Sequence, residues 1–466
     1  MKRSSERSSD PDGTRLPIKL DTTSNGEFEP MPLEPVHIQA NALAHDAASA
    51  NAKRVGLDRR GFLVSAMGAA STLLAFNKAY AAVGQTGGAY DIDEIAALDA
   101  DAAREQLGAR EFIFDVQGHF VGKSWEPRHS LGGSQKFIKD VFLDSDTDMM
   151  VLSFIPSKRD DEVLTISEAS EVAEIVSKLQ GTKRLLIHGR VNPNQPGDTD
   201  DMEELAKKWK VSAFKSYTQW GPNGRGFFLT DDIGVRMIEK ARALGVRNIC
   251  VHKGLPFGPQ SYEHSTCADV GPIAKQFPDM NFLIYHAGFV ADAKEGPYDA
   301  SRADGVDRLI RSAAESGVGA GGNIYPELGS TWRQLMRDPD QAAHVIGKLV
   351  AYFGEDNVLY GSDCIWYGSP QDQIQAFRAF QISPAFQEKF GYKPITPSLR
   401  AKIFGLNAAK VYGIELDEVL QRAETDAIGR ARAEYRADPD PHFLTYGPKT
   451  RRDFLELQRL NGGRPG

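Results

Sequence analysis

Cysteine is scarce in this sequence, which has only three among its 466 residues. Cys250, Cys267 and Cys364 are an odd number, and no two of them form a Cys-x-x-Cys pair. Such a sparse set does not make a disulfide framework and does not match the spacing of a structural zinc site. We therefore expect the three cysteines to pack as small apolar side chains.

An excess of positive charge is also missing. The chain has 55 Lys and Arg against 63 Asp and Glu, which gives a formal net charge of −8. Nucleic acids and anionic membranes attract basic surfaces, so we expect neither as a partner. With 41% hydrophobic and 25% charged residues, the composition is that of an ordinary globular protein with ample core.

The uncharged apolar run at residues 64–76 is too short for a comfortable transmembrane span. It follows Asp58-Arg59-Arg60-Gly61-Phe62-Leu63 and precedes Ala79-Tyr80-Ala81. Paired arginines, an apolar stretch and an Ala-x-Ala site resemble a twin-arginine export signal. Residues 57–82 are therefore predicted to be read by the twin-arginine export machinery, which implies a periplasmic or secreted protein. The alternative is an anchoring or core helix.

The two ends of the chain differ in composition from its middle. Residues 1–56 are rich in Ser, Asp, Pro and Ala and have no sustained apolar period. A segment of this kind buries too little apolar surface to fold, so we expect a disordered leader. Residues 414–466 contain a further helical pattern before a Pro-, Gly- and Arg-rich tail, and we expect a C-terminal helical extension.

Between these ends, short apolar runs alternate with amphipathic stretches from about residue 91 onward. Such alternation is typical of an α/β fold with a parallel sheet, and eight units favour closure as a (β/α)₈ TIM barrel over residues 91–413. A doubly wound open sheet is the alternative, but no Gly-x-Gly-x-x-Gly follows the first strand. The eight strand candidates are residues 112–116, 149–154, 184–189, 211–216, 248–252, 281–286, 321–327 and 357–363.

Long connections are predicted after several of these strands, at the top face of the barrel. They comprise residues 121–148, 255–269, 289–305 and 364–372. Loops on a rigid scaffold are where binding residues concentrate, so we expect substrate selection to reside in these connections.

Possible metal ligands stand at the ends of four of the predicted strands. His119 follows the first strand, while His252, His286 and Asp363 end the fifth, sixth and eighth. Barrel active sites form at the C-terminal ends of the strands, so these side chains are expected to converge. An isolated histidine is more often structural, but imidazole and carboxylate together are the ligands that Zn²⁺ and Mn²⁺ take. The pattern indicates a metal centre.

These strand ends also resemble a known family. The segments Asp115-Val116-Gln117-Gly118-His119, Val251-His252-Lys253, Tyr285-His286-Ala287-Gly288 and Gly361-Ser362-Asp363 are similar to those of the amidohydrolase superfamily. The resemblance is greatest to the branch that includes aminocarboxymuconate-semialdehyde decarboxylase, γ-resorcylate decarboxylase and several lactone hydrolases. Asn407-Ala408-Ala409-Lys410-Val411-Tyr412-Gly413 is similar to the closing-helix segment of that branch. The resemblance implies a barrel with a mononuclear divalent metal.

The resemblance also implies residue roles. His119, His252 and Asp363 would bind the metal, with zinc expected and manganese as the alternative. Gln117 stands where the family has its first histidine, and an amide oxygen is a weaker, neutral ligand. Asp363 would also act as general base, and His286 would polarise the substrate or shuttle a proton.

Substrate contacts are assigned to Lys215, Arg128 and Trp366. Lys215 ends the fourth strand, where other branches of the superfamily carry a carbamylated lysine that bridges two metals. A substrate-facing or salt-bridged lysine is the interpretation we favour, because the rest of the pattern resembles a mononuclear branch. Arg128 lies on a top loop, where it could hold a carboxylate by a bidentate contact; a solvent-exposed arginine is the alternative. For His188, at the end of the third strand, a substrate contact and a packed core histidine both stay open.

The sequence predicts a metal-dependent hydrolase that activates a water to cleave a small carboxylate-bearing amide, ester or lactone. A metal-dependent, non-oxidative decarboxylase of an aromatic or muconate-type acid is the runner-up. A degenerate, non-catalytic barrel is the third option, because Gln117 replaces the first metal histidine. A small-molecule carboxylate is the expected substrate, and assembly as a homodimer stays open.

Overall fold

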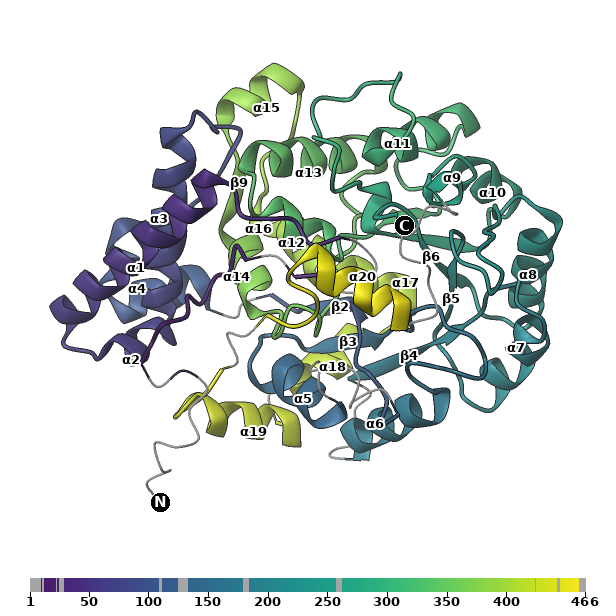
Figure 1. Cartoon of the computed structure of the whole chain (residues 1–466), viewed down its shortest axis with the longest axis horizontal. Helices are drawn as coiled ribbons and strands as arrows, with labels where there is room; N and C mark the ends of the chain where they lie inside the picture. The colour runs from purple at the N-terminus through teal and green to yellow at the C-terminus, as the bar shows by residue number, and fades with distance from the viewer. Residues whose placement is uncertain are drawn as a thin grey trace.

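A computed structural model describes residues 10, 12–21, 23–24, 29–108, 111–124, 133–178, 184–256, 262–423, 425–441 and 445–460. Figure 1 shows strands in the centre of the molecule, an arc of helices around them, and a separate helical group formed by the N-terminal residues. Within the described part of the chain, no helix is both long and apolar enough to cross a membrane.

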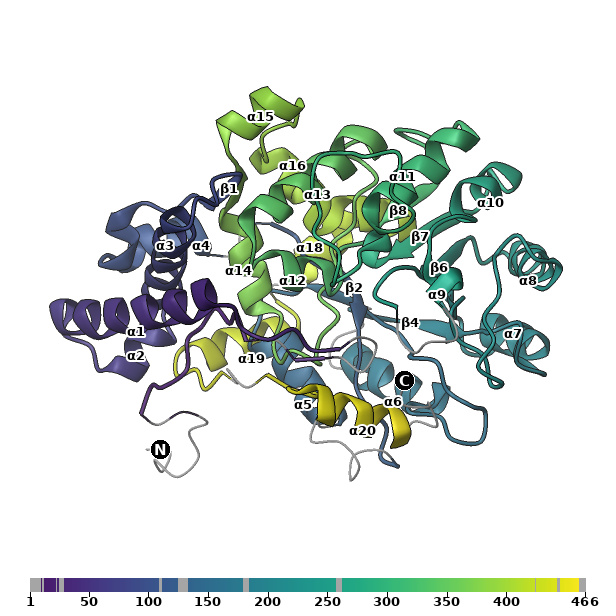
Figure 2. The ribbon, with the colours of Figure 1, turned by 45° about the horizontal axis from the view of Figure 1, so that its top comes forward.

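Parallel strands build the central sheet, and each pairs with its neighbour in the sequence, in the order β2 to β8. This order is what a barrel requires, because every strand–helix–strand connection then moves one step in the same direction. Figures 1 and 2 show the curl of the sheet. The strands are β2 (Phe114–Gly118), β3 (Met149–Leu152), β4 (Leu185–Arg190), β5 (Ala213–Tyr217), β6 (Asn248–His252), β7 (Asn281–Tyr285) and β8 (Ile324–Pro326).

The predicted eighth strand, residues 357–363, is not a regular strand, but it closes the barrel. Isolated bridges join Leu359 to Glu327 on one side and Cys364 to Gly118 on the other. The backbone N–H of Asp363 donates to the carbonyl of Gln117 at 2.9 Å. Asp363 has a φ of +59°, which is incompatible with a continuous pleat. The segment therefore links β8 to β2 through single contacts instead of a ladder.

Helices alternate with the strands and cover the outside of the sheet, so the predicted α/β barrel fold is confirmed. Their buried faces are apolar, as in α13 (Pro339–Phe353), where Val345, Ile346 and Leu349 are fully buried. The covering helices are α6 (Ile166–Lys178), α7 (Asp198–Lys207), α8 (Asp232–Ala243), α10 (Val270–Gln276), α11 (Gly305–Ser316), α13 (Pro339–Phe353), α16 (Pro397–Ala401), η6 (Lys402–Leu406) and α17 (Asn407–Tyr412).

The remaining elements are short or lie outside the barrel. Strands β1 (Gly88–Tyr90) and β9 (Phe380–Ile382) form an antiparallel pair. The predicted C-terminal extension contains α18 (Leu416–Ala423), α19 (Ala427–Arg436) and α20 (Arg451–Leu460). The others are η2 (Glu94–Ala97), α4 (Ala100–Leu107), α5 (Ser134–Ile138), η4 (Lys139–Leu143), α9 (Tyr262–Ser265), η5 (His286–Gly288), α12 (Thr331–Leu335), α14 (Gln371–Ala379) and α15 (Pro384–Phe390).

The expected disorder over residues 1–56 differs from the structure in its second half. Helix α1 (Pro35–Val55) packs along α3 (Ala66–Ala82), with the short α2 (Arg59–Leu63) between them. The physical reason is a stripe of small residues spaced four apart on one face of α1, which lets the two backbones approach closely. Its members are all buried: Ala40, Ala44, Ala48 and Ala52. The composition of this segment concealed that period.

The paired arginines of the predicted export signal are engaged in the folded chain. Arg59 donates through Nε to the carbonyl of Gly13 at 2.7 Å and through Nη1 to that of His45 at 3.0 Å. Arg60 forms an ion pair with Asp440 at 2.6 Å. The apolar run behind them is buried in α3. The segment is thus packed as part of the fold, and its predicted role in export stays a prediction.

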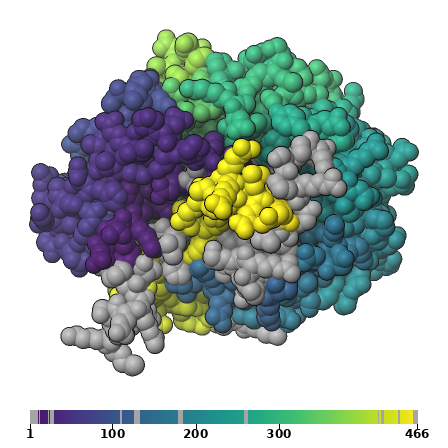
Figure 3. Space-filling view, viewed as in Figure 1, coloured from purple at the N-terminus to yellow at the C-terminus, as the bar shows by residue number. Residues whose placement is uncertain are grey.

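Residues 16–21 and 23–24, here called the N-terminal strap, lie on the loop that follows the barrel-closing segment. Lys19 Nζ donates to the carbonyl of Tyr367 at 3.2 Å, and Thr23 Oγ1 donates to that of Trp366 at 3.3 Å. At the end of the strap, the backbone N–H of Ser24 donates to the carbonyl of Pro448 at 2.7 Å. Figure 3 shows α20 on this face beside the N-terminal residues. The two chain ends meet over the Trp366–Tyr367 loop.

The alanine stripe gives a direct test of this packing. Ala48→Leu places extra volume in the closed α1–α3 interface and is expected to destabilise the protein by about 1–3 kcal/mol. Ala50→Leu makes the same chemical change on the exposed face of α1 and is expected to alter stability by less than about 0.5 kcal/mol. Urea unfolding followed by circular dichroism measures both; equal stability of the two variants would show that α1 does not pack on α3.

Candidate active site

Four predicted site residues reach the same end of the barrel and form two contacting pairs. His119 and Asp363 make one pair, and His252 and His286 make the other. Their strands are parallel neighbours or bridge partners, so their C-terminal ends lie at one rim. All four side chains are fully or almost fully buried. Strand-end placement therefore identified a real cluster of chemistry-bearing groups.

In the first pair, His119 Nε2 lies 2.9 Å from Asp363 Oδ1. The other ring nitrogen, Nδ1, lies 3.1 Å from the carbonyl of Ser153, which can only accept, so Nδ1 carries a proton. In a neutral ring, Nε2 would then present a lone pair to the carboxylate. Two electron-donating atoms at this distance need positive charge, either a second ring proton or a bound cation.

Gln117 adds a third group to this pair. Its amide nitrogen donates to Asp363 Oδ1 at 3.0 Å and lies 3.4 Å from His119 Nε2. Neighbouring ligand atoms of a zinc ion, each about 2.1 Å from the metal, are roughly 3.0–3.4 Å apart. The three atoms therefore have the spacing of one face of a coordination shell, provided that the amide presents its oxygen there. The two ends of an amide group have nearly the same shape, so its orientation is inferred from the surrounding hydrogen bonds.

The surroundings of Gln117 support that reversed amide. Its Oε1 is buried and has no hydrogen-bond partner among the described residues. A Cβ on Gly329 would lie 2.1 Å from this oxygen and 2.6 Å from Oε1 of Glu327, so two acceptors occupy the same corner. Turning the amide gives Glu327 a donor and turns the oxygen toward His119 and Asp363. The residues present fit a divalent cation with His119, Asp363 and the Gln117 oxygen as ligands.

The second pair, His252 and His286, is not part of the His119–Asp363–Gln117 triangle. His286 Nε2 lies 3.1 Å from His252 Nδ1, and His286 Nδ1 donates to the carbonyl of Gly329 at 2.6 Å. The ring of Tyr217 stacks on His252 with 4.9 Å between centroids. Within the described ranges, no three His, Cys, Asp or Glu side chains cluster in a way that could hold a metal. The role of His252 as a further ligand stays a prediction.

Glu327 belongs to the site and was missed by the sequence analysis. Its Oε2 accepts the backbone N–H of His286 at 3.1 Å, and its Oε1 accepts that of Gly329 at 2.6 Å. A Cβ on Gly361 would lie 1.6 Å from Oε1, so glycine is required there for the carboxyl group to fit. The available signal was its position directly after the apolar residues of β8, the same rule that identified the other strand ends.

Burial changes the protonation of two carboxyl groups around the site. Burial raises the pKa of Glu327 to about 7, against the opposing influence of His286. Burial likewise raises the pKa of Asp115 to about 7, although Ser362 and the backbone of Gln117 donate hydrogen bonds to it. The charge of Asp363 contributes to both increases. Three carboxyl groups thus share one poorly solvated region.

Two of the three predicted substrate residues lie beside the pairs. Trp366 stacks on the ring of His119 with 5.3 Å between centroids. Lys215 is buried, with its amine 3.5 Å from the ring centre of Tyr285 and 4.7 Å from that of Tyr217. Arg128 lies outside the described residues.

His188, which the sequence left open, is a packed histidine in this structure. Its Nε2 lies 3.1 Å from the hydroxyl of Tyr412, and its Nδ1 lies 3.4 Å from Ser153 Oγ. Burial and the nearby charge of Lys215 hold the pKa of His188 well below its usual range, so the ring is neutral. The three cysteines are buried and free, as expected.

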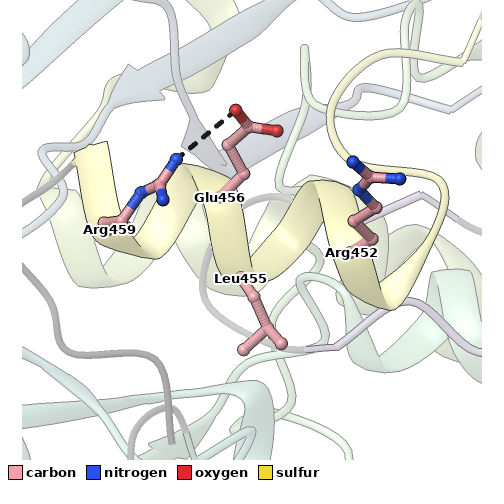
Figure 4. Close-up of a pocket in the computed structure, with 4 residues that line it drawn as sticks. All are labelled: Arg452, Leu455, Glu456 and Arg459. Atoms are coloured by element: carbon pink, nitrogen blue, oxygen red, sulfur yellow. Dashed lines mark ion pairs between the residues drawn. The ribbon is translucent and has the colours of Figure 1, made fainter.

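A separate hollow of about 250 Å³ lies against helix α20 (Figure 4). Arg452, Leu455, Glu456 and Arg459 line it, and Arg459 pairs with Glu456 at 3.6 Å. None of these is a predicted site residue, and the charged side chains are exposed on the helix surface. The hollow is therefore not the site formed by the strand ends.

The raised pKa of Glu327 predicts a pH dependence of stability. The proton on Glu327 binds more tightly in the folded state than in the unfolded state. The stability that this binding adds is fully present below about pH 4, the pKa of the unfolded glutamate, and is lost as pH rises through the folded pKa. Glu327→Gln stays neutral, and its free energy of unfolding is expected to fall less between about pH 5 and 8. Exposed Glu388→Gln is the control. Parallel stability curves for all three proteins would contradict the raised pKa.

Comparison with known proteins identifies the family of this chain. The amidohydrolase family model matches residues 114–414. A 2,6-dihydroxybenzoate decarboxylase from Rhizobium is 15% identical, and the alignment covers 66% of this chain and 99% of that one with a TM-score of 0.40. A dihydroxybenzoic acid decarboxylase from Polaromonas, solved with bound manganese and the inhibitor 2-nitroresorcinol, is 13% identical. The alignment covers 67% of this chain and 99% of that one, with a TM-score of 0.39. A candidate 2-pyrone-4,6-dicarboxylic acid hydrolase from Pseudomonas putida is 14% identical. The alignment covers 66% of this chain and 99% of that one, with a TM-score of 0.38.

A search of curated protein sequences gave no significant match. The family assignment therefore depends on the family model, which spans well over half of the chain. The matched region contains β2 to β8, the barrel-closing segment and both contacting pairs. From this match, and in agreement with the strand-end residues, the chain belongs to the amidohydrolase family.

Proposed function

We propose that this amidohydrolase is a metal-dependent hydrolase that cleaves a small carboxylate-bearing amide, ester or lactone. The observation that carries the proposal is the triangle of His119 Nε2, Asp363 Oδ1 and the Gln117 amide, with edges of 2.9, 3.0 and 3.4 Å. We propose zinc as the cation, with manganese as the alternative, because imidazole and carboxylate suit both. When bound, the cation supplies Lewis acidity and lowers the pKa of a water ligand.

The residues of this chain would supply the remaining chemistry. Asp363 is the only carboxylate in the triangle and would take a proton from the attacking water. His286 is held in one tautomer, because Nδ1 donates to the carbonyl of Gly329. Its Nε2, which faces His252 Nδ1 at 3.1 Å, would then exchange the proton. Lys215 and Trp366 would contact the substrate, with the buried ammonium offering the positive charge that a carboxylate requires.

A decarboxylase of an aromatic or muconate-type acid is the second candidate. It is favoured by the aromatic rings around the site, since Trp366 stacks on His119 and Tyr217 stacks on His252. Aromatic side chains can hold a flat aromatic acid by stacking. Measuring carbon dioxide release against acid release over a panel of carboxylates separates the two reactions: carbon dioxide identifies a lyase, and a new acid group without it identifies a hydrolase.

Metal binding tests the proposal without knowledge of the substrate. We expect equilibrium dialysis to give about one zinc or manganese ion per chain. His119→Ala is expected to abolish binding, and Gln117→His is expected to tighten it, because imidazole is the stronger ligand. Half-buried His45→Gln, on α1 and outside the triangle, serves as a control that keeps the site intact. A wild-type chain that binds no divalent cation would favour the degenerate barrel instead.

Turnover tests the role of Asp363. Asp363→Asn keeps the shape of the side chain but removes the base, and we expect loss of activity by about 10²-fold or more with little change in fold. Asp232→Asn, on the exposed start of α8, is the matched control. Full activity of the Asp363 variant on a substrate that the wild type converts would refute this assignment.

We also propose that residues 57–82 direct export by the twin-arginine machinery to the periplasm or beyond. The support is the order of paired arginines, apolar run and Ala-x-Ala site. In a bacterium that has this machinery, we expect mass spectrometry of the product to show a new N-terminus after Ala81. Replacement of Arg59 and Arg60 by lysine is expected to abolish that product. A full-length chain that stays in the cytoplasm would refute the proposal.

A further inference from the structure

Ser330 occupies the turn after β8 and is fully buried. Its hydroxyl donates to Asp363 Oδ2, and it lies 2.7 Å from the hydroxyl of Tyr367. A serine hydroxyl has one proton, and the carboxylate can only accept it, so Tyr367 is the donor in the second bond. The hydrogen bonds run in one direction, from Tyr367 to Ser330 to Asp363.

With the Ser330 hydrogen bond, both oxygen atoms of the Asp363 carboxylate have a neighbouring polar group. Oδ1 faces His119 at 2.9 Å and Gln117 at 3.0 Å, while Oδ2 faces Ser330. With both oxygen atoms engaged, rotation about the bond that carries the carboxylate is blocked. Without the Ser330 hydroxyl, the Oδ2 side loses this donor and the carboxylate can turn away from His119.

The backbone at Ser330 is unfavourable for a serine. Its φ is +53° and its ψ is −35°, on the side of conformational space that residues with a Cβ rarely adopt. Glycine would be the relaxed residue at such a position. Strained residues of this kind persist when the surrounding structure holds them, and they gather at functional sites. Here the neighbours hold both sides of the turn, since the backbone N–H of Gly329 donates to Glu327 Oε1 at 2.6 Å and Thr331 Oγ1 donates to the carbonyl of His286 at 2.9 Å.

We propose that Ser330 is a positioning residue, which keeps a strained backbone because its hydroxyl must orient the Asp363 carboxylate toward the cation. This inference rests on the proposed function, in which Asp363 binds the metal. Groups that orient a metal ligand typically change metal affinity by about 10–100-fold when they are removed. The inference gives Ser330 a task that its place in the turn alone does not require.

Two substitutions separate the hydroxyl from the strain. Ser330→Ala removes the hydroxyl and keeps the strained backbone, whereas Ser330→Gly removes both. We expect both variants to bind Zn²⁺ or Mn²⁺ about 10–100-fold more weakly than the wild type. We also expect the glycine variant to unfold at a higher urea concentration than the alanine variant, because glycine adopts positive φ at no steric cost.

Lys210 offers a matched control, because it has a φ of +51° and is exposed. Lys210→Gly is expected to raise the urea midpoint while leaving metal affinity unchanged. The measurement is competition for the metal against a chelator, on the full-length chain, with circular dichroism to establish that each variant is folded.

The outcomes distinguish this inference from the function on which it rests. A wild-type chain without metal affinity overturns both. A wild type that binds metal, together with a Ser330→Gly or Ser330→Ala variant of equal affinity, overturns the positioning role alone. Weaker binding by both folded variants, with the glycine variant the more stable, supports it.

Discussion

The barrel of this protein is closed by a few hydrogen bonds around Asp363, and the candidate site depends on that closure. The segment ending at Asp363 links the last strand of the sheet to the first, although it forms no ladder of its own. The same backbone that joins β8 to β2 therefore carries the carboxylate to His119 and Gln117. The segment that closes the barrel therefore also brings the groups of the candidate site together.

Charge compensation is the second constraint at this rim. Asp115, Glu327 and Asp363 are all buried at the same end of the barrel. Isolated carboxylates are costly to bury, so such a group either takes a proton or acquires a positive neighbour. Burial raises the pKa of the first two toward neutrality. Asp363 instead has His119 beside it, and a cation bound there would satisfy the remaining charge.

The sequence predicted the fold through its alternating pattern, and most of the site through one rule. A polar residue at the end of a buried parallel strand must face the rim, which located His119, His252, His286 and Asp363. The pattern placed β6 at its observed bounds, residues 248–252. It could not show that residues 357–363 lack a regular ladder, because strand propensity does not report the positive φ at Asp363.

What the sequence concealed depends on contacts between distant segments. Ser330 acquires its role only when the turn after β8 meets Asp363, and a serine in a turn is not informative by itself. Glu327 carried a strand-end signal, but its contact with the backbone of His286 forms only in the folded chain. Helix α1 was missed for a different reason, because its buried stripe consists of alanines, which contribute little to any measure of apolar period. The orientation of the Gln117 amide likewise depends on neighbours that only the folded chain brings together.

The position of the N-terminal strap has a consequence for maturation. The strap precedes the Ala79-Tyr80-Ala81 sequence, yet it supports the loop whose Trp366 covers His119. A peptidase that cut after Ala81 would sever the strap from the barrel, leaving only noncovalent contacts to retain it. Cleavage would then weaken the support of the Trp366 loop and link processing of the chain to exposure of the His119 ring.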